Sequence, residues 1–180
     1  MRWLLLPLLG LSLGCALPIS TQLGAQEQPP KLEKIAVESF SDDLTRGSTI
    51  APDAAGIVTA RVLAALTRET DLEIVPPGET TRGVDAVLSG VVRRYEERVG
   101  GPGGAFKPAS VWFTQELRTL EGELIWSGTF EETQRALSED LGSLPRAWRR
   151  GFKWLTAAEL ATEGADELAT ALAEDTAPWS

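Results

Sequence analysis

Two runs of alternating residues, 109–118 and 123–132, constrain the fold of this 180-residue chain more than any other feature. Both runs alternate large apolar residues with polar ones, a pattern typical of strands that bury one face. Only Thr119-Leu120-Glu121-Gly122 separates them, which is short enough for a tight turn. The two runs therefore predict an antiparallel hairpin that lies with one side on a core.

The register of this hairpin follows from the turn. Pairing Leu117 with Leu124 places Val111 opposite Phe130, and one face then carries nearly all the large apolar side chains. The other face carries Trp112 together with a set of small or polar residues: Ser110, Thr114, Glu116, Ser127 and Thr129. We expect that second face to lie away from the core.

The remaining patterns predict further strands, two longer helices and a short one. Strands are expected at 34–40, 72–75 and 84–92, and a helix from Pro52-Asp53 to about Glu69. Thr156 and Glu159 match a capping box that opens a helix running towards Ala173. A short helix is expected between 138 and 151. The fold class predicted is α/β (α+β): a two-layer sandwich in which a mixed sheet of four to five strands is covered by helices mainly on one face.

Composition excludes several classes of function. The chain has no histidine, which removes the commonest general base and metal ligand. Its net charge of −9 would repel phosphate backbones, so we expect no nucleic-acid partner. It has one cysteine, so no intrachain disulfide can form. We expect no catalytic residue, no cofactor and no metal site.

Residues 1–14 contain a single charged residue, Arg2, followed by an apolar run that is too short to span a bilayer as a permanent helix. The run ends in Leu11-Ser12-Leu13-Gly14-Cys15, which resembles the lipobox of bacterial lipoprotein precursors. The resemblance implies cleavage before Cys15 and attachment of diacylglycerol to its thiol. The alternative is an ordinary cleaved signal with an incidental cysteine. Ala16 in place of Asp resembles the signal for outer-membrane retention, with the domain facing the periplasm.

This organisation divides the chain into four parts. Residues 1–14 are the signal peptide, and 15–32 form a lipid-anchored flexible tether because they are polar and contain a Pro-Pro pair. Residues 33–174 form a single domain, and 175–180 are expected to fray.

The acidic pairs and the glycine-rich segment are the other candidates for chemistry. Asp42-Asp43 lies in a loop, whereas Glu96-Glu97 and Glu131-Glu132 are neighbours along strands and point to opposite faces. We interpret all of them as solvated surface; an enzyme acting through Asp42 or Glu131 is the remaining alternative. The segment Gly100–Gly104 is followed by a strand rather than a helix, so a hairpin tip is favoured over a phosphate loop.

One basic and aromatic cluster interrupts the acidic chain. It consists of Arg146, Trp148, Arg149, Arg150 and Lys153, with Trp154 beside it. Such a cluster is suited to contact with anionic lipid head groups or an acidic partner. The alternative is that the tryptophans pack into the core while the cationic side chains point to water.

Several segments together resemble a group of small envelope domains. They are the opening strand 34–40 that ends in Phe40, the helix after it, the segments 72–75 and 83–90, and Gly122-Glu123-Leu124-Ile125-Trp126-Ser127-Gly128. The group includes the N-terminal domain of the translocation protein TolB, the curli secretion lipoprotein CsgG and the penicillin-binding-protein activator LpoB.

This resemblance implies a non-catalytic, membrane-anchored lipoprotein that binds protein partners in an envelope assembly or transport system. The first alternative is an oligomeric subunit of a secretion ring or channel. Charged residues from Arg93 to Glu97 argue against the long membrane hairpins of curli-type channels. A periplasmic enzyme is the second alternative.

Overall fold

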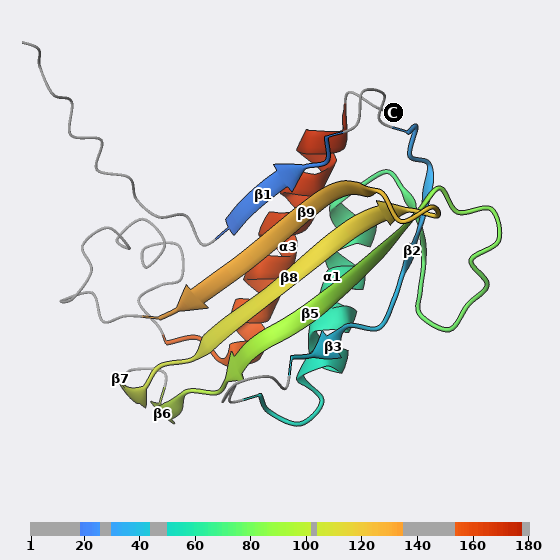
Figure 1. Ribbon diagram of the computed structural model, residues 1–180. Coiled ribbons are helices and arrows are strands. Elements are labelled where there is room, and N and C mark those ends of the chain that lie inside the picture. The colour runs from blue at the N-terminus through green and yellow to red at the C-terminus, as the bar shows by residue number, and fades with distance from the viewer. Residues whose placement is uncertain (1–18, 26–29, 44–49, 102–103, 135–153, 178–180) are drawn as a thin grey trace, which may run out of the picture.

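The computed structural model describes residues 19–25, 30–43, 50–101, 104–134 and 154–177 (Figure 1). Within them the chain forms an α+β fold in which two helices pack against one face of a mixed seven-stranded sheet. The helices are α1 (Ala54–Glu69) and α3 (Ala157–Thr176). The fold class predicted from sequence is confirmed, although the sheet has more strands than expected.

The sheet follows the order β1-β9-β8-β5-β2-β4, with the short β3 also paired to β5. Its strands are β1 (Ile19–Leu23), β2 (Lys34–Val37), β3 (Ser41–Asp42), β4 (Glu73–Val75), β5 (Ala86–Glu96), β8 (Ser110–Thr119) and β9 (Leu124–Thr133). The pairs among β2, β3, β4 and β5 are parallel, whereas β5, β8, β9 and β1 are joined by antiparallel pairs. A separate small hairpin, β6 (Val99–Gly101) with β7 (Gly104–Lys107), extends from the end of β5.

The β8–β9 hairpin forms with the predicted faces but with a different register. Leu117 pairs with Trp126 rather than with Leu124, and Phe113 pairs with Phe130. An irregularity follows Leu117, so Leu124 lies opposite Arg118 instead. The observed register differs from the prediction by two residues along most of the hairpin. Because side chains alternate with a period of two, such a shift leaves the residues of β9 from Trp126 onward on their predicted faces. Leu124 is the exception: it lies opposite Arg118, on the side away from the core, and Ile125 is buried instead.

The core lies between the sheet and the two helices. Phe113 and Phe130 are fully buried there, with ring centroids 5.6 Å apart. The ring of Phe130 packs onto Gly164 of α3, where an added Cβ would lie 2.5 Å from the ring. The sequence places this glycine inside a helix that it should weaken. The close approach of the Phe130 ring is the physical reason for a glycine at that position.

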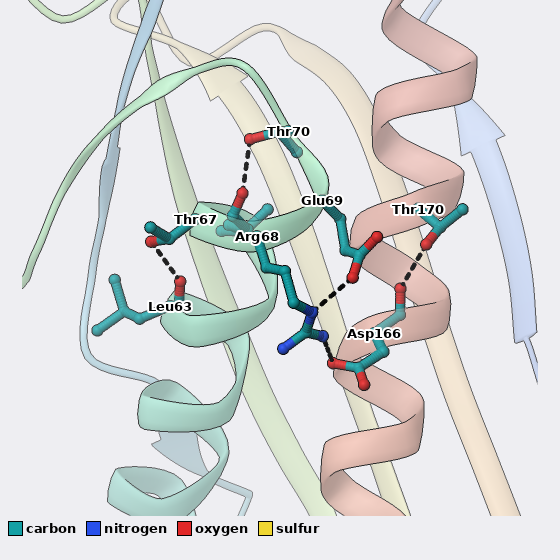
Figure 2. Close-up of polar contacts among 8 residues, drawn as sticks. Leu63, Thr67, Arg68, Glu69, Thr70, Asp166 and Thr170 are labelled. Carbon is teal, nitrogen blue, oxygen red and sulfur yellow. Dashed lines mark hydrogen bonds and ion pairs between the residues drawn. The ribbon is translucent and has the colours of Figure 1, made fainter.

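The two helices are joined to each other at the surface by Arg68 of α1. Its guanidinium donates to Glu69 of the same helix and to Asp166 of α3 (Figure 2). The hydrogen bond to Glu69 and then that to Asp166 raise the pKa of Arg68. The hydroxyl groups of Thr67 and Thr170 donate to carbonyl groups within their own helices, as Figure 2 also shows.

The prediction of a flexible tether over 15–32 is wrong for part of that range. Residues Ile19–Leu23 form β1, which pairs with β9 along the edge of the sheet. Leu32 is also buried in the core, with 4% exposure. The Pro-Pro pair and the polar composition indicated a linker, but a strand at the edge of a sheet needs only backbone hydrogen bonds and can be polar on both faces.

Both ends of α3 are fixed by side-chain hydrogen bonds. The capping box of Thr156 and Glu159 is confirmed, and the Glu97 carboxylate accepts a further hydrogen bond from the Ala157 N–H at 3.2 Å. At the other end the helix continues to Thr176. The prediction that the chain frays from residue 175 is therefore wrong for residues 175 and 176. Asp175 there accepts a 2.8 Å hydrogen bond from the indole of Trp126.

Candidate partner-binding face

The face of the sheet opposite α1 and α3 carries no helix within the described part of the chain (Figure 1). It is termed the open face here. Its side chains come from β5, β8 and β9 and are mostly half-buried: Ser89, Val91, Arg94, Trp112, Thr114, Glu116, Ser127, Thr129 and Glu131. This is the polar side that the alternating pattern predicts: Trp112, Thr114, Glu116, Ser127 and Thr129 lie on it as expected. Ser110, predicted for the same side, is buried with 3% exposure.

Trp112 lies at the centre of a cationic cluster on this face. The guanidinium carbons of Arg93 and Arg94 lie 5.4 Å and 5.5 Å from the centre of its ring. Consecutive residues of a regular strand point to opposite faces, so a single ring would normally meet only one of them. Here the β5–β8 register shifts between Val92 and Arg94, which indicates a β-bulge. The bulge is what brings both arginines to one tryptophan.

Each of these arginines also has an acidic partner. Arg93 pairs with Asp43 at 3.0 Å, and Arg94 pairs with Glu131 at 3.4 Å. The side chains of Arg93 and Glu131 are 40% and 51% exposed, so the pairs contribute little to stability in water. They do link the guanidinium groups beside the indole to Asp43 and Glu131.

The polar network continues along the edge of the same cluster. Arg94 lies 3.4 Å from the Ser110 hydroxyl, which in turn lies 2.6 Å from that of Thr133. The Nε1–H of Trp112 is buried and has no hydrogen-bond partner among the described residues. A buried donor without an acceptor costs about 1–3 kcal/mol. The indole of Trp112 is therefore held by its ring contacts rather than by its polar atom.

The candidate residues predicted from sequence fall largely elsewhere. Cys15 and the basic cluster Arg146, Trp148, Arg149, Arg150 and Lys153 lie outside the described residues, so their roles stay predictions. Trp154, beside that cluster, is half-buried. Of the glycine-rich segment, Gly101 at the end of β6 pairs with Gly104 at the start of β7, as expected for a hairpin tip.

The acidic residues considered for catalysis are engaged in structural contacts. Asp43 and Glu131 bind the two arginines, Glu96 pairs with Lys107 at 3.0 Å, and Glu97 caps α3. Asp42 has one buried carboxylate oxygen without a hydrogen-bond partner in the described part of the chain, and it lies in β3 beside β5. These positions join elements of the fold; they do not assemble two carboxylates around a shared substrate position.

Asp85, which opens the strand motif of the family resemblance, also has a structural role. Its Oδ2 accepts hydrogen bonds from the backbone N–H groups of Glu33 and Lys34, both at 2.8 Å. This carboxylate therefore fixes the start of β2 against the start of β5.

Metal-binding clusters and membrane-spanning helices are two further features that bear on function. Nowhere in the described part of the chain do three His, Cys, Asp or Glu side chains come together in a way that would hold a metal ion. Neither of its two helices has the length and apolar character needed to cross a membrane.

The sequence alone placed Trp112 on the polar face but did not associate it with Arg93 and Arg94. The missing element was the bulge, which no local pattern in β5 reveals. One signal was available in the sequence. Trp112 stands among hydroxyl and charged residues on a face expected to be solvated, and large aromatic side chains on such a face are typical of binding surfaces.

The comparisons with known proteins identify the fold. No protein-family model and no curated protein matches the chain. Among solved structures, a single-residue variant of the PelC dodecamer from Paraburkholderia phytofirmans matches with a TM-score of 0.59 at 18% identity, over 86% of this chain and 98% of that one. The PelC dodecamer of the same organism, in another crystal form, matches with a TM-score of 0.58 at 18% identity, over 84% and 96%.

A lipoprotein from Neisseria meningitidis, GNA1162, also matches over 67% of this chain and 97% of its own, with 19% identity and a TM-score of 0.41. The PelC matches are close enough to define a common fold, and their identity is too low to carry more than the fold. This chain is therefore similar in architecture to PelC. The finer resemblance to the TolB, CsgG and LpoB group stays a prediction.

Proposed function

We propose that the protein is an envelope lipoprotein that acts by binding protein partners through the open face, without a catalytic step. The observation that carries this proposal is the cluster of Trp112 with Arg93 and Arg94 on a sheet face that no described helix covers. Tryptophan and arginine are the residues most enriched among those that dominate binding energy at protein interfaces.

The surroundings of the cluster suit a protein partner. Thr114, Thr129 and Ser127 offer hydroxyl groups that donate and accept hydrogen bonds, next to charged groups of both signs. These side chains are presented by a rigid antiparallel sheet, so little conformational entropy is lost on binding. Charge pairs such as Arg94 with Glu131 favour partners of complementary charge and reject others.

The proposed anchor sets where this binding takes place. Cys15 precedes Ile19, the first residue of β1, by four positions, which at about 3.5 Å per residue spans at most about 14 Å. A diacylglycerol on Cys15 would therefore hold the β1 edge of the domain close to the bilayer. We propose the outer membrane as the location, with the domain in the periplasm, and the cluster from Arg146 to Lys153 as a further contact with lipid or partner.

The anchor is tested by intact mass and membrane fractionation of the native protein beside Cys15→Ser. We expect the wild type to carry the mass of diacylglycerol and to sediment with outer membranes, whereas Cys15→Ser loses both. An unacylated, soluble wild type cleaved at another position would refute the anchor.

The open face is tested by site-specific photocrosslinking in intact cells. A photoreactive residue replaces Thr114 on the open face or, as a matched control, Ala60 on the exposed side of α1. We expect a discrete high-mass adduct from position 114 that decreases at least tenfold when Trp112→Ala is added, and none from position 60. Equal adducts at the two positions, or an adduct unaffected by Trp112→Ala, would contradict the proposal.

The alternative of an oligomeric ring subunit is favoured by one specific observation, since the PelC structures with this fold are dodecamers. The decisive measurement is the native mass of the detergent-extracted protein. A single species of many copies would support the ring, and a monomer or dimer would exclude it.

A further inference from the structure

The two edges of the sheet differ in how well they are protected against pairing with another strand. At one edge, β4 has only three residues, is followed by Pro76 and Pro77, and carries a salt bridge between Glu73 and Lys34 at 2.6 Å. Short length, charge and proline are the usual means by which proteins block an edge. The opposite edge, β1, has five residues, Ile-Ser-Thr-Gln-Leu, without a charge or a proline within the strand, and only Pro18 flanks it in sequence.

The backbone of β1 leaves a regular set of groups facing outward. Gly24 donates to the Ile125 carbonyl at 2.8 Å, in the same register that pairs Leu23 with Trp126. Groups that face the neighbouring strand alternate along an antiparallel pair, so Ser20 and Gln22 face β9 as Gly24 does. The N–H and C=O groups of Ile19, Thr21 and Leu23 therefore point away from the sheet.

This edge is complementary to itself. When two copies of β1 run antiparallel about Thr21, each Thr21 lies opposite the other, and Ile19 lies opposite Leu23. The outward groups of these three residues then form six hydrogen bonds, since each such pair exchanges two. Ile19, Thr21 and Leu23 share the helix-covered side of the sheet, and Ser20 lies opposite Gln22 on the open face. Apolar residues thus pair with apolar ones and polar residues with polar ones.

We propose that β1 is an interaction surface for a second copy of this chain, which pairs with it antiparallel about Thr21 and joins the two sheets. Leu23, which is 46% exposed in the single chain, gains an apolar neighbour in the pair. A two-fold axis perpendicular to the sheet relates the two copies, so α3 of each lies on the same side.

The helices leave room for this arrangement. α3 packs chiefly on β9, with β1 and β8 on either side. At a strand spacing of about 4.8 Å, the two copies of β9 lie three spacings apart, or about 14 Å. Packed helices approach to about 8–10 Å, so the two α3 helices do not collide.

The pairing is expected to be weak in solution and strong on a membrane. A five-residue edge buries less surface than a stable dimer interface needs. Two chains anchored to one bilayer, however, meet at a much higher effective concentration. Only this concentration effect rests on the proposed function, and only on its lipid anchor, which the mass measurement on Cys15 tests separately.

The first test is oxidative crosslinking of the full-length protein in membranes, with Thr21→Cys against Ala60→Cys. Cα atoms opposite each other in this pairing lie about 5.5 Å apart, within the range that a disulfide spans. We expect Thr21→Cys to form dimers and no larger product, whereas Ala60→Cys and the wild type form none. No dimer, a ladder of larger products, or the same yield from Ala60→Cys would overturn the proposal.

The second test uses the direction of the backbone groups. Thr21→Pro removes an N–H that points outward and leaves the hydrogen bonds to β9 in place, whereas Thr21→Val keeps that N–H. With the crosslink at Ser20→Cys in one copy and Gln22→Cys in the other, we expect Thr21→Pro to reduce the yield at least tenfold and Thr21→Val to leave it within twofold. Thr21→Lys should also reduce it, because two lysines would face each other. Equal yields from Thr21→Pro and Thr21→Val would refute the outward pairing.

Discussion

The strands β8 and β9 each contribute side chains to two faces of the sheet that have opposite properties. On the covered face Phe113, Leu117 and Phe130 are fully buried against the helices. On the open face Thr114, Glu116 and Thr129 alternate with them along the same strands and stay partly exposed. Because neighbouring residues point to opposite sides, a strand can devote one side to the core and leave the other free to vary. Stability should therefore depend on one face and binding on the other.

The largest difference is expected between two adjacent residues of β9. Phe130→Ala removes a fully buried ring and leaves a cavity, so we expect the free energy of unfolding to fall by about 3–5 kcal/mol. Thr129→Ala, on the open face, should change it by no more than about 0.5 kcal/mol. Urea unfolding monitored by tryptophan fluorescence measures both. A similar loss for the two variants would show that the open face is also packed.

The two tryptophans of the β8–β9 hairpin give a matched comparison of polar contacts. Trp126 donates to Asp175 at 2.8 Å, whereas the Nε1–H of Trp112 is buried without an acceptor among the described residues. Trp126→Phe should cost about 2–3 kcal/mol because a hydrogen bond to a charged group is lost. Trp112→Phe should cost less than about 1 kcal/mol, since no hydrogen bond is lost. Thermal unfolding of the two variants tests the difference, and a greater cost for Trp112→Phe would reverse the assignment of the faces.

Glycines in the two helices give a third, smaller contrast. Gly164 of α3 faces the Phe130 ring, so Gly164→Ala should destabilise the protein by about 1–2 kcal/mol despite the better helix propensity of alanine. Gly56 of α1 is exposed and an added Cβ would have no neighbour within 4 Å. Gly56→Ala should therefore stabilise by about 0.5–1 kcal/mol. Shifts of the denaturation midpoint in opposite directions would support the close packing of α3 on β9.

The smallest effect at neutral pH concerns Tyr95, the only tyrosine in the chain. Burial raises the pKa of Tyr95, and the nearby charge of Glu97 adds to the rise while Arg61 opposes it. Below about pH 10 tyrosine is protonated in both folded and unfolded chains, so stability does not depend on it there. As the pH rises from about 10 through the raised folded pKa, the unfolded chain loses the proton first and stability falls.

Tyr95→Phe should remove this alkaline loss and leave stability near neutral pH almost unchanged. Ultraviolet absorbance of tyrosinate reports Tyr95 directly, and urea unfolding across the alkaline range reports the linked stability. Titration of Tyr95 at or below its ordinary pKa would contradict the burial of its side chain.

The sequence predicts the two faces of the hairpin better than its pairing. Alternation assigns Phe113 and Phe130 to the core and Trp112 to the other side, because the assignment depends only on the period of a strand. The register depends on the turn and on the irregularity after Leu117, which local sequence does not specify. The strand β1 was missed because its central residues 20–22 lack an apolar pattern, and pairing with β9 rather than propensity makes this segment a strand.

The candidate site was less predictable than the fold. The association of Trp112 with Arg93 and Arg94 depends on a bulge in β5, which pairs with β8 on one side and with β3 on the other. The capping box at Thr156, by contrast, was predicted correctly because all its atoms lie within four consecutive residues. Features that are local in sequence were predictable, and those that require distant strands to meet were not.

The pairing of β1 with β9 has a consequence for the order in which the fold forms. β1 precedes every other described strand of the sheet in the chain, yet its partner β9 follows all of them. Closing the long loop between β1 and β9 is slow. We therefore expect the β5–β8–β9 antiparallel unit, whose contacts are closer in sequence, to assemble before β1 pairs with it. During that interval the outer edge of β9 has no paired strand, and β1, which precedes the other described strands in sequence, is the last of them to join the sheet.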